Sequence, residues 1–194
     1  MEIGATKAVQ DRLKTTKIEE SKGASLVFCW DTHLTKIKGR NVLFIVNASN
    51  RYTIAMTDIE PRNWNYYTMY IRSVIHGVMQ EMGYSEDQIG QYFKMSGDTT
   101  VTKTHGRKSV GGINRMVMDA QYFGKKLEKE AKYQWELSEY LNRDICQPEG
   151  FDAYGYPSEL FKLDMERLGI AVKRKPAKII DFTKCIDTNR STNH

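Results

Sequence analysis

SLVFCWDTHLTKIKGRNVLFIVNASNRYTIAM, residues 25–56, carries the clearest structural pattern in the chain. Short runs of apolar and β-branched residues alternate there with two polar turns, 39–41 and 48–50, as in antiparallel strands joined by tight connections. The pattern predicts a meander of strands over 25–30, 34–38, 42–46 and 52–56. The run VLFIV, residues 42–46, lacks polar alternation, so we expect it to be the central strand, covered on both faces.

Apolar residues at helical spacing flank this meander. Thr6 is the expected cap of the first helix, and Ser85 with Gln88 has the spacing of a capping box. Residues 99–104 alternate as a further strand would. The expected helices span 7–14, 61–83, 85–94, a long segment after Gly111-Gly112, and 158–168.

The end of the chain differs from its body. Residues 171–194 hold six lysines and arginines but only two acids. We therefore expect one α+β domain over 1–170, an antiparallel β-meander covered by two or three helices, followed by a basic C-terminal tail over 171–194. Basic tails neutralise phosphates, and the expected contacts here are Lys173, Arg174 and Lys175. The alternative is a solvated chain end.

Composition excludes several classes of protein. With 40% hydrophobic and 11% aromatic residues the chain is globular, and its apolar runs are far shorter than the roughly 20 residues that cross a bilayer. Cys29, Cys146 and Cys185 are odd in number and widely separated, which predicts neither a disulfide framework nor a zinc motif. We expect a cytoplasmic protein without membrane partner, metal or cofactor.

Common catalytic motifs are missing from the sequence. It contains no P-loop, no dinucleotide-binding glycine motif, no nucleophile elbow and no HExxH zinc motif. The chain is therefore more consistent with a binding protein than with an enzyme. One alternative is a metal-independent nuclease or other hydrolase in which His33 and His105 act as acid and base beside Lys103, although lone histidines are more often structural.

Two windows of the sequence hold bases without acids. They lie between Asp31 and Asp58 and between Asp98 and Asp119. If the two windows lie together in the fold, they form a positive surface able to attract phosphate or an acidic protein face. If they lie on opposite sides of the domain, their bases are ordinary charges that keep the protein in solution. Their bases are Lys36, Lys38, Arg40, Arg51, Lys103, Arg107, Lys108 and Arg115.

Several short motifs, in order, carry a resemblance to a known family. They are Thr6-Lys7 with Leu13, the block 28–34 (FCWDTHL), Val46-Asn47 with Arg51-Tyr52, and Lys103-Thr104 with Arg107 and Asn114. Over about residues 1–140 the chain resembles an uncharacterised family of small bacterial proteins, which also occur on mobile elements. The family usually has histidine where this chain has Asp31, and the resemblance implies no activity.

The matched positions are more polar than a core requires, which makes them candidates for a shared ligand site. They are Trp30, Asn47, Arg51, Lys103, Arg107 and Asn114. Turn, cap and core roles are the alternative, since asparagine is a natural turn residue and Arg51 could pair with Asp58.

Three classes of function follow. The first is a small basic binding protein that acts on nucleic acid or on a ribonucleoprotein. By analogy with mobile-element inhibitors of bacterial defence, it could be an anti-CRISPR-like protein that binds Cas9 with its guide RNA. The second is the hydrolase described above. The third is a protein-interaction module whose methionine-rich helix faces form a homo-dimer.

Overall fold

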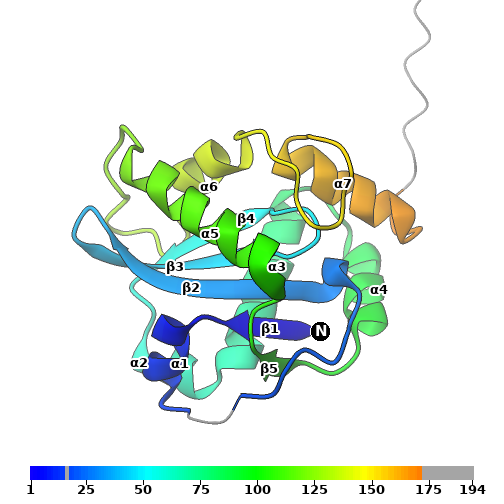
Figure 1. Cartoon of the computed structure of the whole chain (residues 1–194), viewed down its shortest axis with the longest axis horizontal. Coiled ribbons are helices and arrows are strands. Elements are labelled where there is room, and N and C mark those ends of the chain that lie inside the picture. The colour runs from blue at the N-terminus through cyan, green and yellow to red at the C-terminus, as the bar shows by residue number, and fades with distance from the viewer. Residues whose placement is uncertain (16–17, 172–194) are drawn as a thin grey trace, which may run out of the picture.

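The computed structural model describes residues 1–15 and 18–171, which form a five-stranded sheet with helices on both faces (Figure 1). The sheet order is β4-β3-β2-β1-β5. β2, β3 and β4 pair antiparallel, whereas β1 lies parallel to both β2 and β5. The strands are β1 (Glu2–Ala5), β2 (Cys29–Ile37), β3 (Arg40–Asn47), β4 (Thr53–Thr57) and β5 (Thr100–Thr102).

The α+β class and the antiparallel meander are confirmed, with differences in detail. Segments 25–30 and 34–38 are not two strands, because Leu26–Phe28 form a 3-10 turn and Cys29–Ile37 is one continuous strand. β3 is buried from Val42 to Asn47 but lies second in the sheet. β2 takes the middle position because β1 adds to its other edge.

β1 is the strand that sequence patterns missed, and it makes the sheet mixed rather than purely antiparallel. It has only four residues, and Glu2 and Gly4 interrupt any apolar run. All four residues are nevertheless buried, because β1 pairs along both edges, with β2 and with β5. Partners on both sides thus override a weak local signal.

Seven α-helices, rather than two or three, surround the sheet in the described part of the chain. Ser85 and Gln88 form the expected capping box, but the Thr6 hydroxyl donates to Thr32 O instead of capping a helix. The expected helix over 61–83 is divided in two. The helices are α1 (Lys7–Leu13), α2 (Pro61–Asn65), α3 (Tyr67–Glu81), α4 (Glu86–Ser96), α5 (Gly106–Gln121), α6 (Trp135–Asn142) and α7 (Pro157–Arg167).

The two faces of the sheet bury two separate apolar cores. The larger core packs side chains of α1, α3, α4 and α7 against one face, with Trp30, Tyr92 and Phe161 among its largest fully buried members. On the other face, α5 and α6 pack against β3 and β4 (Figure 1). Towards β1 this second face becomes polar, and that polar region forms the candidate site.

Candidate functional site

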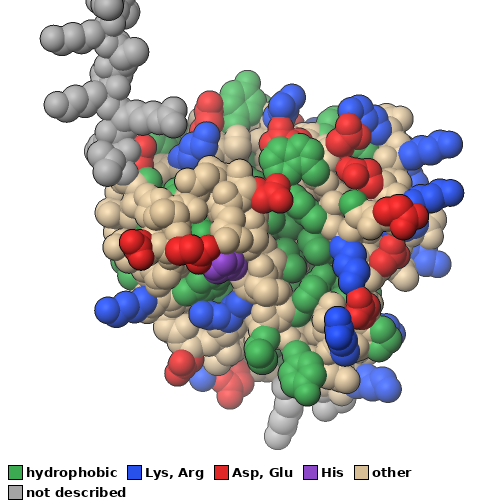
Figure 2. Space-filling model, turned by 180° about the vertical axis from the view of Figure 1, so that it is seen from behind, with side chains coloured by type: hydrophobic (Ala, Val, Ile, Leu, Met, Phe, Trp, Pro, Cys, Tyr) green, Lys and Arg blue, Asp and Glu red, His purple; other side chains and the backbone are tan. Residues whose placement is uncertain are grey.

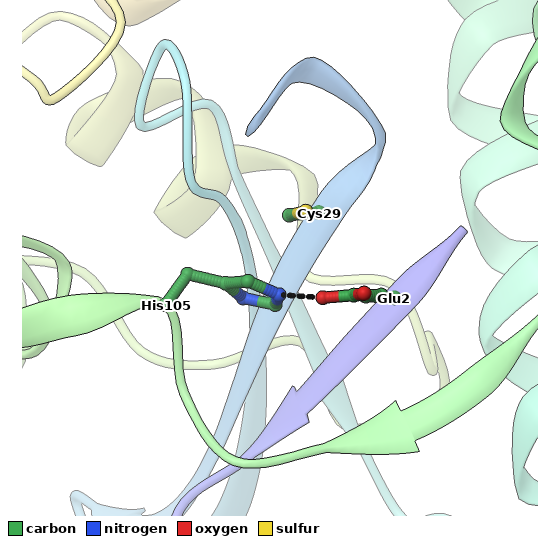
Figure 3. Close-up of side chains that lie close together, drawn as sticks. All are labelled: Glu2, Cys29 and His105. Atoms are coloured by element: carbon green, nitrogen blue, oxygen red, sulfur yellow. Dashed lines mark hydrogen bonds and ion pairs between the residues drawn. The ribbon is translucent and has the colours of Figure 1, made fainter. Parts of the chain in front are cut away.

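The site is a chain of three buried ionisable side chains on the α5 side of the sheet. His105, just before α5, lies between Asp31 of β2 and Glu2 of β1. Its Nδ1 is 2.7 Å from Asp31 Oδ1, and its Nε2 is 3.0 Å from Glu2 Oε2, the contact drawn in Figure 3. None of the three side chains is more than 5% exposed. The contacts are therefore shielded from water. Charge-assisted hydrogen bonds are strong in such a buried environment.

Asp31 is held by more than the imidazole. The backbone N–H of His105 donates to both carboxylate oxygens, at 3.2 and 3.3 Å, and the Ser109 hydroxyl donates to Oδ2. On the opposite strand, Gly4 leaves room for this carboxylate, since a Cβ there would overlap Asp31 Oδ1. The start of α5 is thus fixed to the sheet through one aspartate.

Glu2 is anchored by hydrogen bonds from the loop that precedes the 3-10 turn Leu26–Phe28 and β2. Ser21 Oγ donates to its Oε2 at 2.6 Å, and the Lys22 N–H donates to Oε1 at 2.8 Å. Burial acts to raise the pKa of Glu2, but the hydrogen bonds from Ser21, His105 and Lys22 outweigh it, so the pKa lies below its usual value. Glu2 is therefore ionised although only 4% exposed.

His105 has the most displaced pKa among the histidines of the described chain. Burial acts to lower its pKa, but hydrogen bonding and charge interaction with Asp31, together with the neighbouring Cys29, raise the pKa to about 10. In the absence of a metal ion, the side chain is thus an imidazolium between two carboxylates. Such a fully paired arrangement is what allows three charges to be buried together.

Cys29 brings a sulfur atom to the same place. It pairs with Glu2 in the β1–β2 register, and its thiol donates weakly to the carbonyl oxygens of Ala24 and Ser25, at 3.7 and 3.5 Å. One donor atom each from Glu2, Cys29 and His105 lies within 4.8 Å of the other two (Figure 3). Sequence reasoning missed this group because its members lie on three separate segments without motif spacing.

The two basic windows meet beside this network. Arg107 and Lys108 are exposed in the first turn of α5, and Asn114 is exposed further along it. Arg51, in a left-handed conformation (φ 64°) after β3, places its side chain against Gly112 of α5. Arg51 and Lys108 line one small hollow.

The other predicted binding residues do not join them. Lys38 donates to Lys125 O, and Arg40 bonds Glu128 O and pairs with Asp58, so these two bases hold the 125–129 segment to the β2–β3 hairpin. Lys36 is exposed on the same hairpin. Arg51 does not make the expected pair with Asp58, which Arg40 takes instead.

Further bases have partners of their own. Lys103 pairs with Glu20, and Arg115 pairs with Asp119. Lys173, Arg174 and Lys175 lie outside the described residues.

Two of the polar residues expected to bind a ligand are interior. Trp30 is 1% exposed, belongs to the larger apolar core and donates from Nε1 to Tyr92 OH at 2.9 Å. Asn47 is also 1% exposed; its Nδ2 donates to Val27 O, and its Oδ1 accepts from the Ser49 N–H at 3.0 Å. Both side chains serve packing and turn geometry, which is the alternative that the sequence left open.

The histidine pair of the hydrolase hypothesis does not converge on open space. Both ring nitrogens of His105 are engaged inside the protein. His33 is partly buried, with Nδ1 3.1 Å from the Thr6 hydroxyl, and burial lowers its pKa. This geometry favours structural roles for both histidines over acid–base attack on a phosphate.

A different kind of surface lies on the far side of the molecule. Figure 2 shows, from behind, hydrophobic side chains gathered in a band between charged ones. A groove of about 510 Å³ follows α3 on the face that carries the larger core, lined by Met56, Val74, Val78 and Tyr133 among others.

No helix in the described ranges is both long and apolar enough to span a membrane.

Fold and site together define a small α+β domain with a buried Glu–His–Asp network beneath a basic helix start. The model of a family described as a domain of unknown function, DUF6933, matches residues 2–160. Since this region is most of the chain, the protein belongs to that family, which confirms the resemblance to an uncharacterised family. Neither the curated proteins nor the solved structures include a match to the chain.

Proposed function

We propose that the protein binds nucleic acid through the α5 basic surface, which we define as Arg51, Arg107, Lys108 and Asn114. The observation that carries the proposal is that Arg107 and Lys108 are exposed side by side and make no ion pair within residues 1–15 and 18–171. Nearby bases such as Lys103 and Arg115 are paired with acids. Unpaired cations are the ones that gain most from a phosphate.

The acids close to this surface do not cancel its charge. Asp31 and Glu2 lie beneath it, buried and bonded to His105. Glu149 lines the same hollow as Arg51 and Lys108 and offsets one positive charge there, which leaves the surface with a positive balance. With a net charge of +5 over the whole chain, the surface supports attraction of a polyanion.

Phosphate contacts in this proposal come from side chains rather than from the end of the helix. The His105 N–H at the start of α5 already donates to Asp31. Arginine and lysine contacts to phosphate give affinity without sequence preference, and an exposed asparagine can add a polar contact. We therefore expect binding that is sensitive to salt and tolerant of sequence.

The nucleic acid can be free or part of a ribonucleoprotein. A mobile-element inhibitor of bacterial defence, with an anti-CRISPR-like role against guide-loaded Cas9, is the finer form of the proposal. It rests on analogy and on the basic surface alone, so the test includes Cas9 as one of its targets.

The test compares the full-length protein with Arg107→Ala/Lys108→Ala at two salt concentrations. Lys94→Ala/Lys162→Ala is the matched control, because it removes two exposed lysines elsewhere that also lack ion pairs in the described chain. Binding is measured to single-stranded RNA, duplex DNA and guide-loaded Cas9. We expect the α5 variant alone to weaken binding, with a salt slope smaller by about 1 for each phosphate that the variant no longer neutralises.

Two results would count against the proposal. Equal losses in both variants would mean that net charge, not this surface, attracts the partner. Absence of binding to every target at low salt would remove nucleic acid as a ligand. Tight binding to guide-loaded Cas9 but to neither free nucleic acid would select the inhibitor form.

A further inference from the structure

We propose that Glu2, Cys29 and His105 form a binding site for a divalent transition metal ion of the zinc class. This site is independent of the α5 basic surface, and its three ligands come from β1, β2 and the segment just before α5.

The donor set favours zinc chemistry. Thiolate sulfur, imidazole nitrogen and carboxylate oxygen are the three ligand types that zinc uses in proteins, while calcium and magnesium prefer oxygen alone. The three donor atoms lie within 4.8 Å of one another, and the Glu2 Oε2 to His105 Nε2 distance is 3.0 Å. In a tetrahedral zinc site neighbouring ligand atoms are about 3.3–3.6 Å apart. Small side-chain shifts therefore suffice to enclose an ion.

The residues around these ligands have the arrangement that metal sites require. Metal-bound histidines usually donate their other ring N–H to a carboxylate, which fixes the ring and its tautomer. Asp31 accepts this hydrogen bond from Nδ1 here, at 2.7 Å, and Ser109 and the His105 N–H hold Asp31 in turn. Nε2 is thereby directed at Glu2, beside Cys29. A buried hydrogen-bond network without a metal does not need the sulfur.

Charge is conserved in a simple exchange. The entering M²⁺ displaces the proton shared by His105 Nε2 and Glu2 and the proton of the Cys29 thiol, and both protons leave to solvent. Neutral His105, the Glu2 carboxylate and the Cys29 thiolate then balance the ion, and Asp31 keeps its hydrogen bond to Nδ1. No oxidant or reductant takes part.

The surroundings point to a structural ion. All three ligand residues are buried, and the exposed Ser21–Gly23 loop is bonded to Glu2 and separates it from solvent. Three protein ligands leave a fourth position for water or for the Ser21 hydroxyl, which is 2.6 Å from Glu2 Oε2. An ion here would tie β1, β2 and the start of α5 together.

The first experiment makes Cys29 the one thiol in the full-length chain. Untagged Cys146→Ser/Cys185→Ser protein is stripped of metal and titrated with Co²⁺, which reports thiolate ligation as a charge-transfer absorption band. We expect one equivalent to produce the band, Zn²⁺ to abolish it by competition, and Cys29→Ser in the same background to lack it. The proposal would be overturned if the Cys146→Ser/Cys185→Ser parent protein gave no band, or if the band survived Cys29→Ser.

The second experiment tests the other two ligands by stability, with folding of each metal-free variant verified by circular dichroism. Zn²⁺ should raise the thermal unfolding midpoint of the parent protein but not that of Glu2→Gln or His105→Gln. His76→Gln is the matched control, because His76 lies away from the three ligands, where it contacts Glu86 and stacks on Phe93, and this variant should keep the full response. An equal response in all four proteins would show that the ion binds elsewhere.

Discussion

Trp30 and Asp31 are neighbours on β2, and both are buried, yet they belong to opposite kinds of interior. The Trp30 ring enters the larger core, where it packs against Phe161 at a centroid distance of 6.1 Å. Asp31 enters the polar network and bonds His105 and Ser109. Because strand side chains alternate between faces, one step along the chain changes an apolar environment into an ionic one.

The two interiors depend on their members differently. Apolar burial is non-directional, so neighbours can partly fill the space that a lost group leaves. The polar network has no such tolerance, because each buried donor or acceptor needs its partner. The apolar side should therefore govern the free energy of unfolding, and the polar side should govern the position of the α5 start and the proposed metal site.

The largest effect is expected on the apolar side. Trp30→Ala removes the ring and its hydrogen bond to Tyr92 OH, and should lower the free energy of unfolding by about 3–5 kcal/mol. Urea unfolding measures the change. Metal affinity of the folded protein should stay unchanged, and a loss of Co²⁺ binding in a variant that remains folded would contradict the separation of the two interiors.

Asp31→Asn should cost less stability but disturb the site. The amide keeps the shape of the carboxylate but removes the negative charge beside His105. We expect the free energy of unfolding to fall by about 1.5–3 kcal/mol. Co²⁺ affinity should fall by about 10–100-fold, because Asp31 orients the ligand without touching the ion. Unchanged Co²⁺ affinity would mean that His105 needs no such support.

Gly4→Ala tests the same carboxylate from the other strand. Its methyl group would overlap Asp31 Oδ1, so we expect a loss of about 1–3 kcal/mol. In an Asp31→Ala background the substitution should cost markedly less, because most of the overlap has been removed. Equal costs in both backgrounds would place the strain elsewhere, with the nearby Thr104 backbone as the next contact.

Asp164 on α7 gives the smallest expected effect, as a buried carboxylate on the otherwise apolar side. Burial raises its pKa above the ordinary value of 3.8, and hydrogen bonds from Asn50, Ser49 and Arg167 offset this only in part. The folded state therefore binds the proton more tightly than the unfolded state. The free energy of unfolding of the wild-type protein, relative to that of Asp164→Asn, should rise as pH falls from the raised pKa towards 3.8. At pH values above the raised pKa this difference should be constant.

Urea unfolding of both proteins between about pH 4 and 7 measures this difference, which should stay within about 1 kcal/mol. A difference that instead grows as pH rises would mean that the pairs with Asn50 and Arg167 outweigh burial.

Local patterns accounted for much of the fold. The polar turns predicted the meander, and Ser85 with Gln88 predicted the start of α4, because both signals lie within a few residues. α5 was expected to begin after Gly111-Gly112, yet it starts at Gly106 and runs through them. Packing of Ile113 and Met116 in the second core outweighs the cost of about 1 kcal/mol for each helical glycine.

The site was less accessible to sequence reasoning. His105 and Lys103 were singled out as reactive groups, Lys103 also as a binding residue, and Trp30 was a candidate ligand-site residue with a core role as the alternative. Which neighbour of a strand faces inward depends on register, and the Glu2–Cys29 register exists only once β1 has joined β2. Sequence separation concealed the rest, since the three donors of the proposed metal site share no motif.

The position of β1 also has a consequence for the order of folding. β1, at residues 2–5, precedes the other strands in the chain, but one of its partners begins at residue 29 and the other at residue 100. In the described chain β5 joins the sheet through β1, so β5 cannot dock before β1 has paired with β2. Such non-local pairing slows folding. The local hairpins of β2, β3 and β4 should gain amide protection early in refolding, with β1 and β5 acquiring it last.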